Sequence, residues 1–219
     1  MPHEFGVLFD MDGVLVDSNP VHKKAIQLFC DKYGKSVPES FLQKHIYGRT
    51  NKEWIPVLFK HASEKEIKTL EDEKEALFRQ IFSPRNAVIT GLFSFLDKLQ
   101  KHQIPMVLAT SAPAENADYI LSELKLSHYF QAVLNSSHVK VGKPDPDIYL
   151  KAAQSIECHT NKCVVIEDSF AGIISGKEAG AAVVGITSTH SADELSACDL
   201  VVDSFDDLSC QKLRSLLPV

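Results

Sequence analysis

Two acidic residues lie two positions apart in the segment Phe9-Asp10-Met11-Asp12-Gly13, directly after a run of apolar residues. At an effective dielectric constant of about 20, two like charges about 4 Å apart repel each other by about 4 kcal/mol. A pair of this kind therefore generally holds a cation or shares a proton, and Gly13 allows a sharp turn directly after it. A solvated acidic turn is the alternative, but the apolar residues beside the pair argue against it.

Polar residues also end later apolar runs. Thr110 follows the run 105–109, and Glu167 and Asp168 follow the run 163–166. Short apolar runs with β-branched members are typical of strands buried on both faces of a sheet. The chain has such runs at 5–9, 105–109, 132–134, 163–166, 182–186 and 200–202.

Helical periodicity separates the later runs, over residues 91–104, 115–126, 148–153 and 171–179. Strands that alternate with helices predict βαβ units and therefore an α/β fold with a parallel sheet. Ligands of open parallel sheets bind beyond the carboxyl ends of the strands. We therefore expect Asp10, Thr110 and the Glu167–Asp168 pair to share one crevice.

The segment from about Asp17 to Thr90 has helical periodicity without convincing strand runs. At about 75 residues it is far longer than a single crossover requires. We therefore expect a helical domain of residues 17–88, inserted into a core domain of residues 1–16 and 89–219. Within it, the stretch 64–75 carries Glu and Lys at helical spacing, which predicts a solvated helix face.

The composition indicates a soluble globular protein, with 44% hydrophobic and 24% charged residues. The formal charge of −6 comes from 29 acidic and 23 basic residues, the opposite of the surplus that duplex-binding proteins need. No apolar run approaches the length of a membrane-spanning helix. We therefore expect neither nucleic acid nor a membrane as a partner. The absence of a signal-peptide pattern and the five scattered cysteines favour a cytoplasmic location.

The segment DMDGVLVDS, residues 10–18, closely resembles the signature of the haloacid dehalogenase superfamily, in the Asp-x-Asp form of its phosphoryl-transferring members. Three further segments resemble the family's other motifs in the expected order: 107–110, 141–149 and 165–173. The resemblance spans residues 5 to 207 and is greatest to the β-phosphoglucomutase-like branch. It implies a Rossmann-like parallel-sheet core with a helical cap inserted after the first strand.

The resemblance also implies chemical roles for four acidic residues. Asp10 would be the nucleophile that forms an aspartyl-phosphate, and Asp12 would be the general acid and then the general base. Mg²⁺ would bind the Asp10 carboxylate, the Asp12 backbone carbonyl and Asp168, with Glu167 as a further ligand or as a partner of the ligands. Since dehalogenases lack an acid at the position of Asp12, its presence favours phosphate esters as substrates.

The predicted phosphate-binding residues are Thr110, Ser111, Lys143 and Gly13. By resemblance, Thr110 and Lys143 would hold the transferring phosphoryl group and offset its charge. Taken singly, Thr110 could instead cap a helix and Lys143 could be a surface lysine. The four ordered motifs together argue against these alternatives.

Four residues of the inserted segment are candidates for substrate selection: His22, Arg49, Lys52 and Lys74. The arginine that binds the distal phosphate in the mutases falls at Asn51 here, although Arg49 and Lys52 flank it. His22 and Lys74 could instead be solvent-exposed residues of their helices.

We therefore predict a Mg²⁺-dependent phosphatase that hydrolyses a small phosphorylated metabolite, such as a sugar phosphate, through an aspartyl-phosphate. The first alternative is a sugar-phosphate mutase of the β-phosphoglucomutase type, which needs a firm distal phosphate site. The second is a catalytically silent scaffold with the same fold. We expect a monomer or a weak homodimer.

Overall fold

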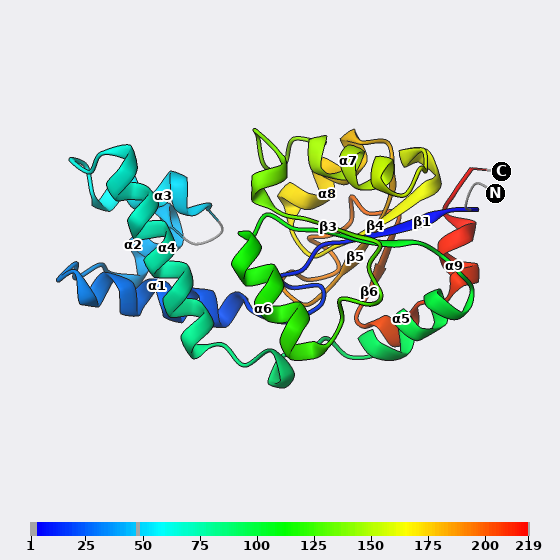
Figure 1. Cartoon of the computed structure of the whole chain (residues 1–219), viewed down its shortest axis with the longest axis horizontal. Helices are drawn as coiled ribbons and strands as arrows, with labels where there is room; N and C mark the ends of the chain where they lie inside the picture. The colour runs from blue at the N-terminus through cyan, green and yellow to red at the C-terminus, as the bar shows by residue number, and fades with distance from the viewer. Residues whose placement is uncertain (1–3, 47–48, 219) are drawn as a thin grey trace. The chain divides into compact units, whose positions relative to one another are not determined.

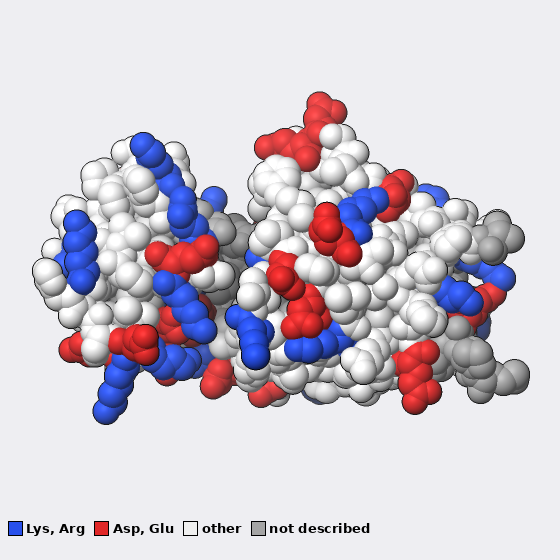
Figure 2. Space-filling view, turned by 90° about the horizontal axis from the view of Figure 1, so that it is seen from above, with Lys and Arg blue, Asp and Glu red and all other residues white. Residues whose placement is uncertain are grey.

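The computed structural model describes residues 4–46 and 49–218. The chain divides into two compact units, one formed by Met1–Asp17 with Pro84–Val219 and the other by Ser18–Ser83. We call them the sheet unit and the helical unit. None of the helices in the described ranges has both the length and the apolar character needed to cross a bilayer. On the face seen in Figure 2, acidic and basic side chains are interspersed.

Six strands of the described residues form one sheet in the order β3-β2-β1-β4-β5-β6 (Figure 1), and all of its neighbouring strands are parallel. The strands are β1 (Gly6–Phe9), β2 (Met106–Ala109), β3 (Ala132–Leu134), β4 (Cys163–Glu167), β5 (Ala182–Ile186) and β6 (Leu200–Val202). The predicted α/β class with a parallel sheet is therefore confirmed.

Helices cover both faces of this sheet, with α7 and α8 on one face and α5, α6 and α9 on the other (Figure 1). Their bounds are α5 (Leu92–Lys101), α6 (Ala114–Leu124), α7 (Asp147–Ser155), α8 (Phe170–Glu178) and α9 (Cys210–Ser215). Short 3₁₀ turns are η1 (Pro84–Asn86), η2 (Ser136–His138), η3 (Thr160–Lys162) and η4 (Phe205–Asp207).

Strand β1 packs against both helical layers, which explains its uninterrupted apolar sequence. Leu8 belongs to the core cluster that includes Tyr149 of α7 and Ile173 of α8. The ring centroid of Phe9 lies 6.3 Å from that of Phe95 on α5, because successive side chains of a strand point to opposite faces. The order of the strands reverses at β1, so a crevice is expected beyond the carboxyl ends of β1 and its neighbours.

The helical unit contains α1 (Asn19–Lys32), α2 (Glu39–His45), α3 (Asn51–Leu58) and α4 (Glu64–Ile81). Its apolar core includes Phe29, Trp54, Ile55 and Leu70. The side chain of Ser63 accepts a hydrogen bond from the backbone of Glu66, and the Glu66 carboxylate accepts one from the backbone of Ser63. This capping box fixes the start of α4.

The prediction of a solvated face over residues 64–75 was wrong for part of α4. Lys74 and Glu75 are buried, and the Lys74 Nζ lies 2.8 Å from Glu75 Oε1 and 2.9 Å from His22 Nδ1 of α1. Asn51 of α3 donates to the same Glu75 oxygen at 2.6 Å. The burial of Lys74 and Glu75 is tolerated because their charges are paired within the unit, and periodicity alone does not show such partners.

Glu71 of α4 is the basis of a stability prediction. It is 7% exposed, and its Oε1 has no hydrogen-bond partner among the described residues. Burial raises its pKa above the usual 4.5. A carboxyl whose pKa is raised by folding destabilises the folded state increasingly as pH rises through that pKa. Glu71→Met is therefore expected to raise the free energy of unfolding at pH 8 by about 1 kcal/mol, and the gain should be smaller near pH 4, where the carboxyl is protonated in both states.

Trp54, the single tryptophan of the chain, is buried in the same unit, so its fluorescence during urea unfolding reports this stability. Glu64→Met, an exposed substitution on the same helix, is the matched control and should change the stability by less than about 0.5 kcal/mol. A loss of stability in Glu71→Met at pH 8, or a gain that is independent of pH, would contradict the prediction.

Candidate active site

Asp10 is the first residue beyond β1, and its backbone N–H donates to the carbonyl of Ile166 in β4 at 3.0 Å. The strand and this hydrogen bond fix its position. Its side chain is nearly buried, and its Oδ1 accepts a hydrogen bond from the Lys143 Nζ at 2.6 Å. Burial raises the pKa of Asp10 well above its usual value, although Lys143 opposes the shift.

Lys143 lies 133 positions from Asp10 in the chain, in the loop between η2 and α7, and only 5% of its side chain is exposed. Besides Asp10, its Nζ donates to Glu167 Oε1 at 2.7 Å and to the carbonyl of Ala109 at 3.1 Å. Burial alone would lower the pKa of Lys143, but the two carboxylates outweigh it and hold the pKa well above its usual value. The alternative of a surface lysine is therefore wrong.

Both carboxylate oxygens of Glu167, the last residue of β4, accept hydrogen bonds. Oε1 accepts from Lys143 and from the Tyr149 hydroxyl at 2.9 Å. Oε2 accepts from the backbone N–H groups of Asp168 and Ser169 and from the Ser169 hydroxyl, each at 3.0 Å. Burial would raise the pKa of Glu167, but Lys143 and these donors lower it. The side chain is therefore held at both of its oxygens.

Asp168 faces the turn at Gly13. Gly13 has a φ of +78°, and a Cβ there would lie 1.9 Å from Asp168 Oδ2. A glycine is thus required both by the backbone conformation and by the close approach of the carboxylate. The Thr189 hydroxyl donates to Asp168 Oδ2 at 2.5 Å, and the Ser188 hydroxyl donates to the Gly13 carbonyl. Burial, and next the charge of Glu167, raise the pKa of Asp168 to about 7.

Asp10, Glu167 and Asp168 each offer a carboxylate oxygen within 4.8 Å of the others, and all three are buried. Burial is the largest cause of the raised pKa values of Asp10 and Asp168, and the charges of the neighbouring carboxylates raise both pKa values further. Asp12 is partly exposed, and its charge contributes in smaller measure to both shifts. Three buried carboxylates beside one lysine form a site suited to bind a hard divalent cation, which prefers oxygen ligands.

Thr110 is the first residue beyond β2 and is buried. It does not cap α6, whose N-cap is Pro113, but its hydroxyl accepts a hydrogen bond from the backbone N–H of Ala112 at 3.0 Å. A hydroxyl that accepts one bond still has a proton to donate, so a phosphate oxygen remains a suitable partner. Ser111 is exposed, and its role in phosphate binding stays a prediction.

Within the helical unit, the structure brings two of the four predicted selection residues together. The His22 ring stacks on Phe78 with centroids 3.7 Å apart, and His22 also contacts Lys74. Both are at least half-buried, so the solvent-exposed alternatives are wrong for them. Arg49 and Lys52 are exposed. The part that these four residues play in substrate choice stays a prediction.

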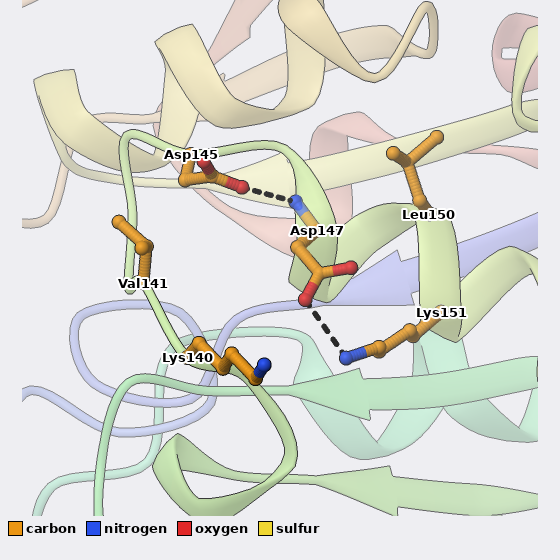
Figure 3. A pocket seen from close by; sticks show the side chains of 6 residues that line it. All are labelled: Lys140, Val141, Asp145, Asp147, Leu150 and Lys151. Atoms are coloured by element: carbon orange, nitrogen blue, oxygen red, sulfur yellow. Dashed lines mark hydrogen bonds and ion pairs between the residues drawn. The ribbon is translucent and has the colours of Figure 1, made fainter.

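A hollow of about 460 Å³ lies beside the loop that carries Lys143 (Figure 3) and is lined by Lys140, Val141, Asp145, Asp147, Leu150 and Lys151. Asp147 pairs with Lys151 at 2.8 Å, and Asp145 accepts a hydrogen bond from the Asp147 backbone N–H. Lys151 also donates to the carbonyl of His138, and Ser175 of α8 donates to that of Asp145. These contacts hold the loop in place.

A comparison of the sequence with known protein families agrees with the geometry of this site. The sequence model of the family described as haloacid dehalogenase-like hydrolase matches residues 7–186. The chain belongs to this family. The resemblance inferred from the four motifs is therefore confirmed.

Among curated members of this family, the chain is 34% identical over 179 residues to a phosphorylated carbohydrates phosphatase of Thermotoga maritima, covering 80% of this chain and 81% of that protein. It is 27% identical over 213 residues to the chloroplastic 5-amino-6-(5-phospho-D-ribitylamino)uracil phosphatase of Arabidopsis thaliana. That match covers 96% of this chain but only 57% of the Arabidopsis protein.

Two solved structures of the family resemble this one over nearly the whole chain. A hydrolase of family IA, variant 3, from Entamoeba histolytica superposes with a TM-score of 0.89 at 28% identity, covering 97% of this chain and 98% of the other. A β-phosphoglucomutase from Clostridium difficile superposes with a TM-score of 0.82 at 25% identity, covering 99% and 97%. The likeness to the β-phosphoglucomutase-like branch is therefore confirmed.

Four residues near the acidic cluster were not among the predicted site residues. Tyr149, Ser169 and Thr189 donate hydrogen bonds to its carboxylates, and Ser188 donates one to the Gly13 carbonyl. A signal existed for Ser188 and Thr189, since they belong to the polar segment that begins with Thr187 directly after the apolar run of β5. Tyr149 gave no signal, because it occupies an apolar position of its helical pattern.

Proposed function

We propose that this chain is a Mg²⁺-dependent phosphatase that hydrolyses a small phosphorylated metabolite, such as a sugar phosphate, through an aspartyl-phosphate on Asp10. The observation that carries the proposal is the buried cluster of Asp10, Lys143, Glu167 and Asp168 beyond the carboxyl ends of β1 and β4. The names of the curated relatives, which include a phosphatase of phosphorylated carbohydrates, support it.

In the first step an Asp10 carboxylate oxygen forms a bond to phosphorus, and the bond from phosphorus to the ester oxygen breaks. Asp12, protonated at this stage, gives its proton to the leaving oxygen. In the second step Asp12 accepts a proton from the attacking water, the water oxygen bonds to phosphorus, and the Asp10 carboxylate is released with inorganic phosphate.

Lys143 offsets the charge that the phosphoryl oxygens carry during both steps, with Thr110 as a hydroxyl donor. Mg²⁺ held by Asp10, the Asp12 backbone carbonyl and Asp168 would supply further positive charge to the phosphoryl group. The five hydrogen bonds to Glu167 favour a role in holding Lys143 over direct metal ligation.

Asn51 favours hydrolysis over the mutase reaction. It stands where a mutase has the arginine for the second phosphate, and its amide is engaged within the helical unit. Its Nδ2 donates to Glu75 at 2.6 Å, and its Oδ1 accepts from the indole N–H of Trp54 at 3.1 Å. We further propose that the helical unit is the cap that selects the leaving group, with His22 and Lys74 as its central polar residues.

Phosphorus NMR of the purified chain with Mg²⁺ tests the proposal. The substrates are β-glucose 1-phosphate, seeded with a trace of the bisphosphate, and a panel of sugar and polyol phosphates. We expect inorganic phosphate to appear from at least one ester and EDTA to stop its release. Glucose 6-phosphate without free phosphate would identify a mutase instead. A chain that converts none of the esters would support the silent scaffold.

A further inference from the structure

Tyr149 of α7 lies fully buried behind the acidic cluster. Its hydroxyl donates to Glu167 Oε1 at 2.9 Å, and the centroid of its ring lies 4.7 Å from the Lys143 Nζ. A phenylalanine would fill the same apolar space between α7 and the sheet. The hydroxyl is therefore the feature that packing alone does not explain.

The Glu167 Oε1 receives two donors from different elements, the ammonium of Lys143 at 2.7 Å and the Tyr149 hydroxyl. Its partner oxygen is held by the backbone that follows β4. The carboxylate is thus restrained at both oxygens, and Oε1 accepts hydrogen bonds from both an ammonium and a neutral hydroxyl.

The second donor at Oε1 affects how strongly Glu167 attracts the Lys143 ammonium. The ammonium has three protons to donate, and it contacts Asp10, Glu167 and the carbonyl of Ala109. To serve a phosphoryl oxygen it must loosen one of these contacts. A Glu167 that also accepts from Tyr149 attracts the ammonium less than one that does not, while the ring face supports the charge from behind.

We propose that Tyr149 is a positioning residue. Its hydroxyl holds Glu167 so that the Lys143 ammonium lies beside Asp10 and can exchange one of its present contacts for a hydrogen bond to a phosphoryl oxygen. The inference rests on the proposed phosphatase function. Tyr149 itself touches neither the substrate nor the reacting atoms.

Tyr149→Phe tests the role of the hydroxyl, since the ring and its contact with Lys143 are kept. We expect kcat to fall about tenfold with KM changed less than twofold. The reason is that Lys143 stabilises the charge of the phosphoryl group in the transition state more than in the bound substrate. Tyr129→Phe is the matched control: the Tyr129 hydroxyl also donates to a carboxylate, that of Asp97 at 2.5 Å, but in an exposed contact. Its kcat should equal that of the unmodified chain.

A double-mutant cycle with Lys143→Met separates positioning from a general loss of structure. The rates are those of p-nitrophenyl phosphate hydrolysis at high protein concentration with Mg²⁺. If Tyr149 acts through Lys143, adding Tyr149→Phe to Lys143→Met lowers the residual rate less than twofold. An equal tenfold loss in both backgrounds, or an unchanged kcat in Tyr149→Phe, would overturn the inference while the phosphatase function stands. An inactive unmodified chain would overturn both.

Discussion

Asp10→Asn is expected to lower turnover by about 10⁴-fold or more, which is the loss typical of removing a catalytic nucleophile. An amide nitrogen or oxygen does not form the acyl-phosphate that a carboxylate oxygen forms. The change is isosteric, and the amide oxygen can still accept the hydrogen bond that Lys143 now donates to Oδ1 at 2.6 Å. The variant should therefore fold, with cooperative unfolding measured by circular dichroism.

Asp12→Asn is the informative companion of this variant, because the two acids have different parts in the proposed reaction. In Asp12→Asn the first step should slow strongly with alkyl phosphates but only weakly with p-nitrophenyl phosphate, since nitrophenolate leaves without a proton. A burst of nitrophenolate should therefore persist, while steady-state turnover of both esters falls because the second step lacks its general base. Asp10→Asn should abolish both reactions. Asp72→Asn, an exposed change on α4, is the control. Turnover in Asp10→Asn above a hundredth of the normal rate would remove Asp10 from the role of nucleophile.

The sequence was sufficient to predict the edge of the sheet at which the acidic cluster lies. Strands buried on both faces give uninterrupted apolar runs, so the first polar residue after each run marks the carboxyl end of a strand. This reasoning identifies Asp10 after β1, Thr110 after β2 and the Glu167–Asp168 pair at the end of β4. Parallel pairing then brings these ends to one edge.

Contacts between residues distant in the chain were beyond this reasoning. Lys143 was found only through the resemblance of its motif, since nothing local shows that a loop lysine is buried against Asp10. Tyr149 has the spacing of an ordinary core residue, and its hydroxyl gains a partner only because α7 packs beside the end of β4. Gly13 was expected for its turn, but the nearness of Asp168 appears only in three dimensions.

The same limit explains the buried charges of α4. A helix with Glu and Lys at regular spacing has the same sequence pattern whether water or a neighbouring helix provides the partners. Lys74 and Glu75 are buried because α1 and α3 supply His22 and Asn51. The charge pattern of one segment therefore does not determine its solvent exposure.

Lys143→Met is expected to affect both stability and turnover. Its ammonium lies between two buried carboxylates, 2.6 Å from Asp10 Oδ1 and 2.7 Å from Glu167 Oε1. Removing one partner of a buried ion pair typically destabilises the fold by about 3–5 kcal/mol, because the remaining charge is left uncompensated. Turnover should fall by about 10²–10³-fold, the usual effect of removing a group that stabilises charge in the transition state.

Lys68→Met is the matched control for this variant, since Lys68 pairs with Asp72 one turn away at 2.7 Å on an exposed face. Such pairs contribute only about 0.3–0.5 kcal/mol. Urea unfolding of both variants in EDTA measures the difference. Mg²⁺ should restore part of the stability that Lys143→Met loses, because a cation bound by Asp10 and Asp168 neutralises the same carboxylates and binds only the folded state. If Lys143→Met were as stable as Lys68→Met, the carboxylates would not depend on this lysine, and Lys143 would have no central part in the site.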